Sequence, residues 1–127
     1  MANRARTKVF FDGGCRPNPG PIETAVMLRG QAHIRRDHGR GTHQDAEWLA
    51  LIEALRWAQA EGLADFVLIG DALAVVRVAS GLARPAAEVA HHLAAFRALA
   101  GEHVPPVRHV RRAQNLAGIA LNRLHPR

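Results

Sequence analysis

The chain has very little cysteine and lysine, with one residue of each, and it has no long apolar run. A single cysteine excludes a disulfide within the chain and is typical of proteins in a reducing compartment. A membrane-spanning helix would need about 20 consecutive apolar residues. The basic N-terminal stretch MANRARTK also lacks the apolar segment of a signal peptide. The sequence therefore predicts a cytoplasmic protein with no membrane partner.

What the chain does have is an ordinary globular composition and an excess of positive charge. It contains 127 residues, of which 48% are hydrophobic and 22% charged. This composition predicts one domain over residues 1–127, and we expect a monomer. The 17 basic residues exceed the 11 acidic ones, giving a formal net charge of +6. Such a charge favours a polyanionic partner such as nucleic acid, although solubility alone would explain it equally well.

Hydrophobic periodicity predicts a mixed order of strands and helices. Three short strands, at residues 7–11, 25–28 and 31–36, are close enough in sequence to form an antiparallel meander. Apolar runs at residues 66–69 and 107–110 predict two further strands. Helices are expected at residues 42–60, 73–79, 86–100 and 117–124. Strands interspersed with helices predict an α/β domain with a mixed sheet.

Three carboxylates are placed where they could meet. Asp12 follows the apolar run Val9–Phe11, Asp71 follows the run at residues 66–69, and Glu47 lies in the first turns of the long helix. Each alone has a simpler interpretation, as a turn residue, the mouth of a strand or a helix-dipole partner. If the two strands are neighbours, however, the three charges converge and repel one another. Mg²⁺ prefers oxygen ligands, and two such ions about 4 Å apart can clamp a phosphodiester during hydrolysis.

Four segments carry distinctive motifs, in this order along the chain: FFDGGCRPNPGP (10–21), THQDAEWLALIEAL (42–55), VLIGDALAVV (67–76) and VRRAQNLAGIALN (110–122). Together they resemble the motifs of type 1 ribonuclease H. The resemblance implies a ribonuclease H-like fold with a five-stranded mixed sheet flanked by helices. In that fold the first three strands are antiparallel, and the first, fourth and fifth are parallel. It also implies metal-dependent endonucleolytic cleavage of the RNA strand of RNA–DNA hybrids, with Mg²⁺ or Mn²⁺ as cofactor.

The resemblance also implies a role for particular residues. Asp12, Glu47 and Asp71 match three of the four metal-binding, catalytic carboxylates of the family. Backbone and small polar groups near the RNA strand can detect its 2′-hydroxyls. The positions matching nucleic-acid contacts are Gly13, Gly14, Cys15, Asn18, Thr42, His43, Gln44, Arg112 and Asn115. His43 and Gln44 replace a pair of asparagines in the family motif.

The fourth family carboxylate is missing, because its position falls on Ile119. Asn122, on the same face of the predicted helix, and His125, just beyond the end of that helix, are alternative sources of a ligand atom. The sequence leaves open whether catalysis survives this loss. The alternative is a catalytically weak or inactive nucleic-acid-binding protein, and a third hypothesis is cleavage of another substrate such as double-stranded RNA.

A few other residues carry expectations of their own. His91 and His92 are adjacent on a predicted helix, so we expect them to point apart and not to share a metal ion. Glu23 is expected to face solvent. Trp48 is expected in the core or, alternatively, at the surface as a stacking platform for a base or sugar.

Overall fold

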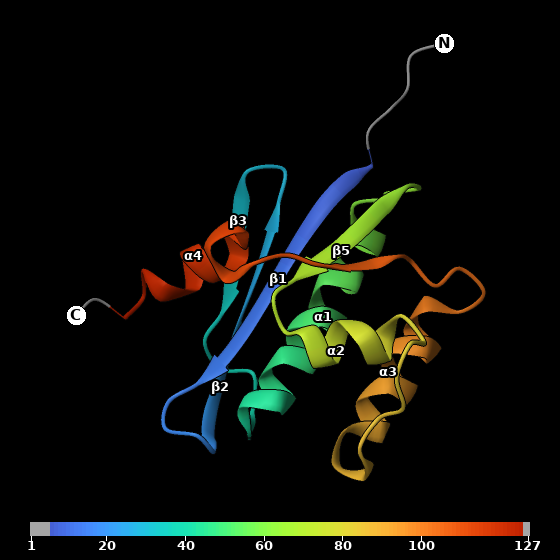
Figure 1. The fold of residues 1–127 in the computed structure, drawn as a ribbon. Coiled ribbons are helices and arrows are strands. Elements are labelled where there is room, and N and C mark those ends of the chain that lie inside the picture. The colour runs from blue at the N-terminus through green and yellow to red at the C-terminus, as the bar shows by residue number, and fades with distance from the viewer. Residues whose placement is uncertain (1–5, 126–127) are drawn as a thin grey trace.

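The computed structural model describes residues 6–125, which form a sheet between two unequal layers of helices (Figure 1). The strands are β1 (Thr7–Cys15), β2 (Gly20–Leu28), β3 (Gln31–Arg35), β4 (Arg40–Gly41), β5 (Phe66–Gly70) and β6 (Val107–His109). The α-helices are α1 (His43–Ala60), α2 (Leu73–Ala79), α3 (Ala90–Ala100) and α4 (Leu116–Asn122), and two 3₁₀ turns are η1 (Ala87–Val89) and η2 (Arg112–Gln114). No helix within this part of the chain combines the length and apolarity needed to cross a membrane.

The sheet is mixed, with the order β3-β2-β1-β5-β6, and β4 pairs with β2. β1, β2 and β3 are antiparallel neighbours, whereas β5 runs parallel to β1 and β6 parallel to β5. The predicted fold class is therefore confirmed. The one strand beyond the five expected is β4, whose two residues, Arg40 and Gly41, carry no apolar alternation that a sequence pattern could reveal.

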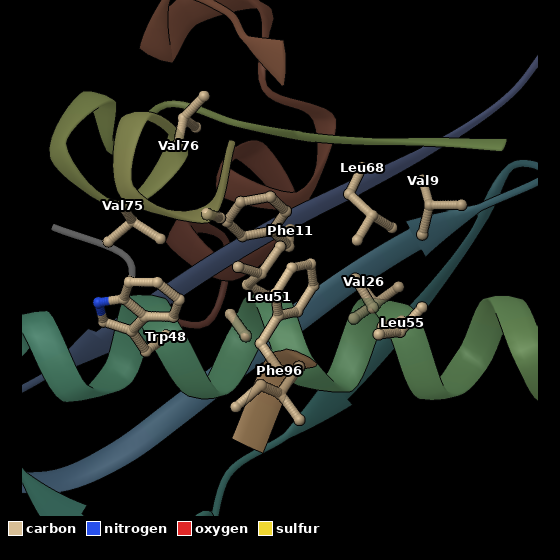
Figure 2. Packing of buried hydrophobic residues seen from close by; sticks show 14 of the residues in the cluster. Val9, Phe11, Val26, Trp48, Leu51, Leu55, Leu68, Val75, Val76 and Phe96 are labelled. Atoms are coloured by element: carbon tan, nitrogen blue, oxygen red, sulfur yellow. The ribbon is translucent and has the colours of Figure 1, made fainter. Parts of the chain in front are cut away.

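Helix α1 covers one face of the sheet together with α3 and α2, and α4 lies on the opposite face (Figure 1). Figure 2 shows the main core, in which Val9 and Phe11 of β1 pack against Leu51 and Leu55 of α1. Trp48 is 1% exposed and belongs to this core. It is therefore buried rather than a surface platform for stacking.

Strand β1 is longer than the apolar pattern predicts, because it continues through Asp12 and both glycines to Cys15. Its extension pairs with the early part of β2, with Asp12 opposite Ala25 and Gly14 opposite Glu23. Asp12 therefore lies within a strand, and not just beyond one. Glycines weaken the sequence signal of a strand, which explains why the extension was not predicted.

Gly13 allows α1 to pack directly on the backbone of β1. A Cβ atom at this position would lie 2.1 Å from the carbonyl oxygen of Ala46, a distance that no real side chain tolerates. The start of α1 itself is fixed by Thr42, as predicted, through a capping box in which Thr42 and Asp45 bond to each other's backbone N–H groups. These two features set the first turns of α1, and hence Glu47, against the middle of β1.

Candidate metal centre and nucleic-acid groove

Asp12, Glu47 and Asp71 meet at one edge of the central strands. Asp12 lies within β1, Asp71 directly follows β5, and the parallel register pairs Phe10 with Ile69 just before them. Glu47 reaches the same point from the first turns of α1. One carboxylate oxygen from each residue lies within 4.8 Å of the other two. The structure thus brings together the three residues that the sequence predicts as metal ligands.

The electrostatics of this cluster favour a bound cation. Burial, together with the charge of Asp71, raises the pKa of Asp12 well above its usual range, although nearby Arg112 partly opposes this. Burial and the charge of Asp12 likewise raise the pKa of Glu47. Without a cation the cluster therefore holds protons that ordinary carboxyls would have released at neutral pH. An all-oxygen donor set that repels itself fits a hard divalent cation.

Hydrogen bonds from Gly13 and Asn115 hold two of the three carboxylates in place. The backbone N–H of Gly13 donates to Glu47 Oε1 at 2.9 Å. Asn115 Nδ2 donates to Asp71 Oδ2 at 3.0 Å and to the carbonyl of Phe11 at 2.9 Å. Asn115 Oδ1 also accepts from Ala117 N and so caps α4.

The burial of Asn115 corrects one sequence-based prediction. Its side chain is completely buried, with 0% exposure, so it cannot contact nucleic acid as the family resemblance suggested. It is a positioning residue for Asp71 and α4. The signal that could have indicated this is its place directly before a helix, where asparagine is a favoured N-cap.

The edge contributed by α4 carries no acid next to the cluster. Gly118 of α4 faces Asp12, since a Cβ at Gly118 would be 3.4 Å from Asp12 Oδ2. Ile119 is 38% exposed, so it is not a packed core residue. Asn122 and His125 line a cavity of about 150 Å³ together with Asp12, and they are the neighbours that the sequence offered as alternatives.

Glu23 also lines this cavity, contrary to the expectation that it faces solvent. Its carboxylate is paired with His125 on one oxygen and with Arg36, at 2.9 Å, on the other. Glu23 lies opposite Gly14, two places along the ladder from the Asp12–Ala25 pair, and therefore shares a face with Asp12. The alternation of side chains along β2 could have revealed this position, because Glu23 is two residues before Ala25 and so points to the same face of the sheet.

The predicted nucleic-acid contacts differ in exposure, and Gly14 is half-buried where it lines the cavity beside Asp12. Gly13 and Cys15 are buried, and the Gly13 N–H is taken by Glu47. Asn18, Thr42, His43 and Gln44 are exposed around the start of α1. Asn18 Oδ1 accepts from the backbone N–H of His43 at 3.0 Å and from Cys15 Sγ at 3.6 Å, which ties the β1–β2 turn to α1.

A groove with arginines at its wall runs beside the cluster. It has a volume of about 630 Å³ and is lined by apolar side chains such as Leu73 and Val75. Glu47, His43 and Arg112 line both this groove and the small cavity at Asp12. Arg77 and Arg84 also line it. Glu47 therefore connects the carboxylate cluster with the groove, where a polyanion could bind.

Comparison with known proteins agrees with the motifs. Residues 11–124 match the family described as reverse transcriptase-like. The chain belongs to this family. Ribonuclease HI of Halobacterium salinarum is 37% identical over 81 residues, which is 60% of this chain and 41% of that protein's length. The match thus spans less than half of this curated relative.

Solved ribonuclease H1 structures resemble the whole described fold. The enzyme from Halobacterium salinarum NRC-1 has a TM-score of 0.78 at 29% identity, covering 92% of this chain and 94% of that one. LC11-RNase H1, solved in complex with an RNA/DNA hybrid, has a TM-score of 0.77 at 27% identity, covering 91% of this chain and 93% of that one. These matches confirm the resemblance to type 1 ribonuclease H.

Proposed function

We propose that this protein is a metal-dependent endoribonuclease that cleaves the RNA strand of RNA–DNA hybrids. The observation that carries the proposal is the convergence of Asp12, Glu47 and Asp71 within 4.8 Å beside a groove lined by arginines. The similarity to ribonuclease H1 proteins, one of them solved with a hybrid, supports the choice of substrate. We further propose that the protein acts as a monomer in the cytoplasm.

Asp12, Glu47 and Asp71 would hold Mg²⁺, or Mn²⁺ in its place. When bound, divalent cations supply neutralisation of the phosphate and polarisation of the scissile phosphodiester. The residues of the chain supply the geometry. Gly13 fixes Glu47 through its N–H, and Asn115 fixes Asp71 through its amide. Hydrolysis by this family type leaves a 5′-phosphate and a 3′-hydroxyl.

Arg112 is the basic residue best placed to bind the substrate backbone. It is exposed and lines both the cavity and the groove. Its positive charge also acts to lower the pKa of Asp12. A guanidinium in this position can hold a phosphate oxygen in two hydrogen bonds. Arg77 and Arg84 extend the same basic surface along the groove.

The second candidate function is binding of nucleic acid with weak or absent cleavage. The observation that favours it is the edge of α4, where Gly118 and Ile119 stand in place of an acid. Catalysis would then depend on three carboxylates alone, and the groove would retain its affinity for nucleic acid.

The deciding experiment compares cleavage of labelled RNA–DNA hybrid, duplex RNA and duplex DNA in Mg²⁺ and in Mn²⁺. The protein must be purified from a host that lacks its own ribonuclease H, with Asp12→Asn as the matched control. Hybrid cleavage that disappears in the variant supports the proposed activity. Hybrid binding without cleavage by the wild type would favour the binding function, and cleavage of duplex RNA alone would change the substrate.

A further inference from the structure

A second group of side chains with the chemistry of metal ligands lies outside the carboxylate cluster. Asp45 of α1 and His91 and His92 of α3 each present one ligand atom within 4.8 Å of the other two. The rings of His91 and His92 are 3.9 Å apart between centroids, at a tilt of 38°. The expectation that these adjacent histidines point apart is therefore wrong.

The position of the two histidines at the helix start explains why they converge. They are the second and third residues of α3, and helical side chains lean toward the N-terminus of their helix. Both rings can therefore extend toward α1. Periodicity alone places neighbouring residues on different faces, but it does not describe this shared direction in the first turn.

Asp45 uses its two oxygens for different purposes. Oδ2 accepts from the backbone N–H and the hydroxyl of Thr42, at 2.9 Å and 3.0 Å, as part of the capping box. Oδ1 is hydrogen-bonded to His92 Nε2 at 2.8 Å, and a bound cation would take the place of this hydrogen bond. A cation bound to Oδ1 would therefore leave the cap of α1 intact.

The ring of His92 is held in place by its surroundings and is not a mobile surface histidine. It is 7% exposed and stacks against Trp48, with ring centroids 6.3 Å apart and planes 10° from parallel. His91 is exposed and gives the cluster an opening to solvent. The buried ring of His92 would keep such a site ordered, and the exposed ring of His91 would let a cation enter from solvent. Asp45, between them in the group, is half-buried.

We infer that Asp45, His91 and His92 form a binding site for a transition-metal cation of the Zn²⁺ type. Zn²⁺ readily accepts a set of two imidazoles and one carboxylate, whereas Mg²⁺ prefers a set made of oxygen ligands alone. Tetrahedral ligation places ligand atoms about 3.3 Å apart. The separation of 2.8 Å between Asp45 and His92 therefore needs only a small adjustment.

The surroundings leave room for a water molecule as the fourth ligand. A pocket of about 320 Å³ adjoins the cluster and is lined by Asn18, Thr42, Asp45 and Glu88 among others. The site is also separate from the candidate catalytic centre. Asp45 and Glu47 are two residues apart on α1, which turns their side chains about 200° away from each other. A cation here would join α3 to the start of α1.

The test is titration of the purified full-length protein with Zn²⁺ in a large excess of Mg²⁺, followed by calorimetry and by competition with a chromophoric chelator. We expect one Zn²⁺ per chain and a rise in melting temperature with Zn²⁺ concentration. Losing an outer partner of a metal typically weakens binding 10–100-fold, so losing the ligand in His91→Ala should weaken it by at least about tenfold. His91 is exposed, so this variant should fold normally.

Two controls locate the ion. His103→Ala, which removes another exposed histidine, should leave the affinity for Zn²⁺ unchanged. Asp12→Asn should also leave it unchanged, because this residue belongs only to the carboxylate cluster. The proposal is overturned if no Zn²⁺ binds, if His91→Ala binds as well as wild type, or if Asp12→Asn rather than His91→Ala abolishes binding.

Discussion

Asp12 is the residue on which the proposed chemistry depends most, since it shares its cavity with Glu47 and lies beside Asp71. Asp12→Asn should abolish metal-dependent cleavage of the hybrid. It should leave the folded state as stable as before, or more stable, because it removes one of three charges that repel one another. Cleavage assays and thermal melts without metal check the two halves of this prediction. Cleavage near the wild-type rate would remove Asp12 from the proposed site.

The pH dependence of stability should report the same cluster. The pKa values of Asp12 and Glu47 are raised in the folded chain, so the folded state binds their protons more tightly than the unfolded state. Their favourable contribution is complete at acid pH and is lost as the pH rises through the raised pKa values.

We therefore expect the metal-free protein to lose stability as the pH rises above the ordinary carboxyl range, and Mg²⁺ to restore part of it. The loss should be smaller in Asp12→Asn. Denaturant titrations at several pH values, with and without Mg²⁺, measure this. An equal slope in the wild type and the variant would contradict the assignment of the effect to this cluster.

Ile119 tests whether the missing fourth acid limits catalysis. Ile119 is 38% exposed, so the carboxylate of Ile119→Asp can reach water and the substitution should cost little stability. If residue 119 faces the metal edge, the cleavage rate in Mg²⁺ should rise. A gain of about tenfold corresponds to roughly 1.4 kcal/mol of barrier lowering.

The matched control for this substitution is Ile119→Asn, because asparagine has the shape of aspartate without its charge. It should give a smaller gain or none. If neither variant cleaves faster while both fold normally, the missing carboxylate at residue 119 does not limit the cleavage rate. That result would favour the function of nucleic-acid binding without efficient cleavage.

At the scale of the elements, the contact between α1 and β1 holds Glu47 in position. Gly13→Ala would place a Cβ 2.1 Å from the carbonyl oxygen of Ala46, so α1 must move away from the sheet. Overpacking of this kind typically costs about 1–3 kcal/mol. The shift would also lengthen the hydrogen bond from Gly13 N to Glu47 and slow cleavage.

Gly14→Ala is the control for that prediction, because the nearest atom to its new Cβ is the Leu121 side chain at 3.9 Å. Urea unfolding of the two variants should show a clear loss of stability for Gly13→Ala and little change for Gly14→Ala. Equal stability of both variants would mean that the close packing of α1 on β1 is not rigid.

At the scale of the whole molecule, the net charge of +6 and the arginines along the groove predict electrostatic binding. Affinity for an RNA–DNA hybrid should fall steeply as salt rises, because contacts between arginine and phosphate release counterions. Hybrid should remain preferred over duplex DNA of the same sequence if the protein detects 2′-hydroxyls. Fluorescence anisotropy with the inactive Asp12→Asn variant measures both, and equal affinity for the two duplexes would indicate only a general basic surface.

The order of the strands and helices other than β4, the N-cap Thr42 and the three carboxylates could all be predicted from the sequence. Two of these carboxylates follow apolar runs, and the third lies in the first turns of the long helix. These are local features, set by periodicity and by the chemistry of single residues, so they can be recognised without knowing the neighbours in space. The family motifs added the pairing of β1 with β5, which brings Asp12 and Asp71 together.

Which residues share a surface could be learned only from the three-dimensional arrangement of the elements. The extension of β1 across Gly13 depends on its ladder with β2, and the place of Glu23 in the cavity follows from the same register. The burial of Asn115 and the convergence of His91 and His92 on Asp45 depend on how helices meet strands and other helices. Such contacts join residues far apart in the chain, and a pattern that spans a few residues carries no information about them.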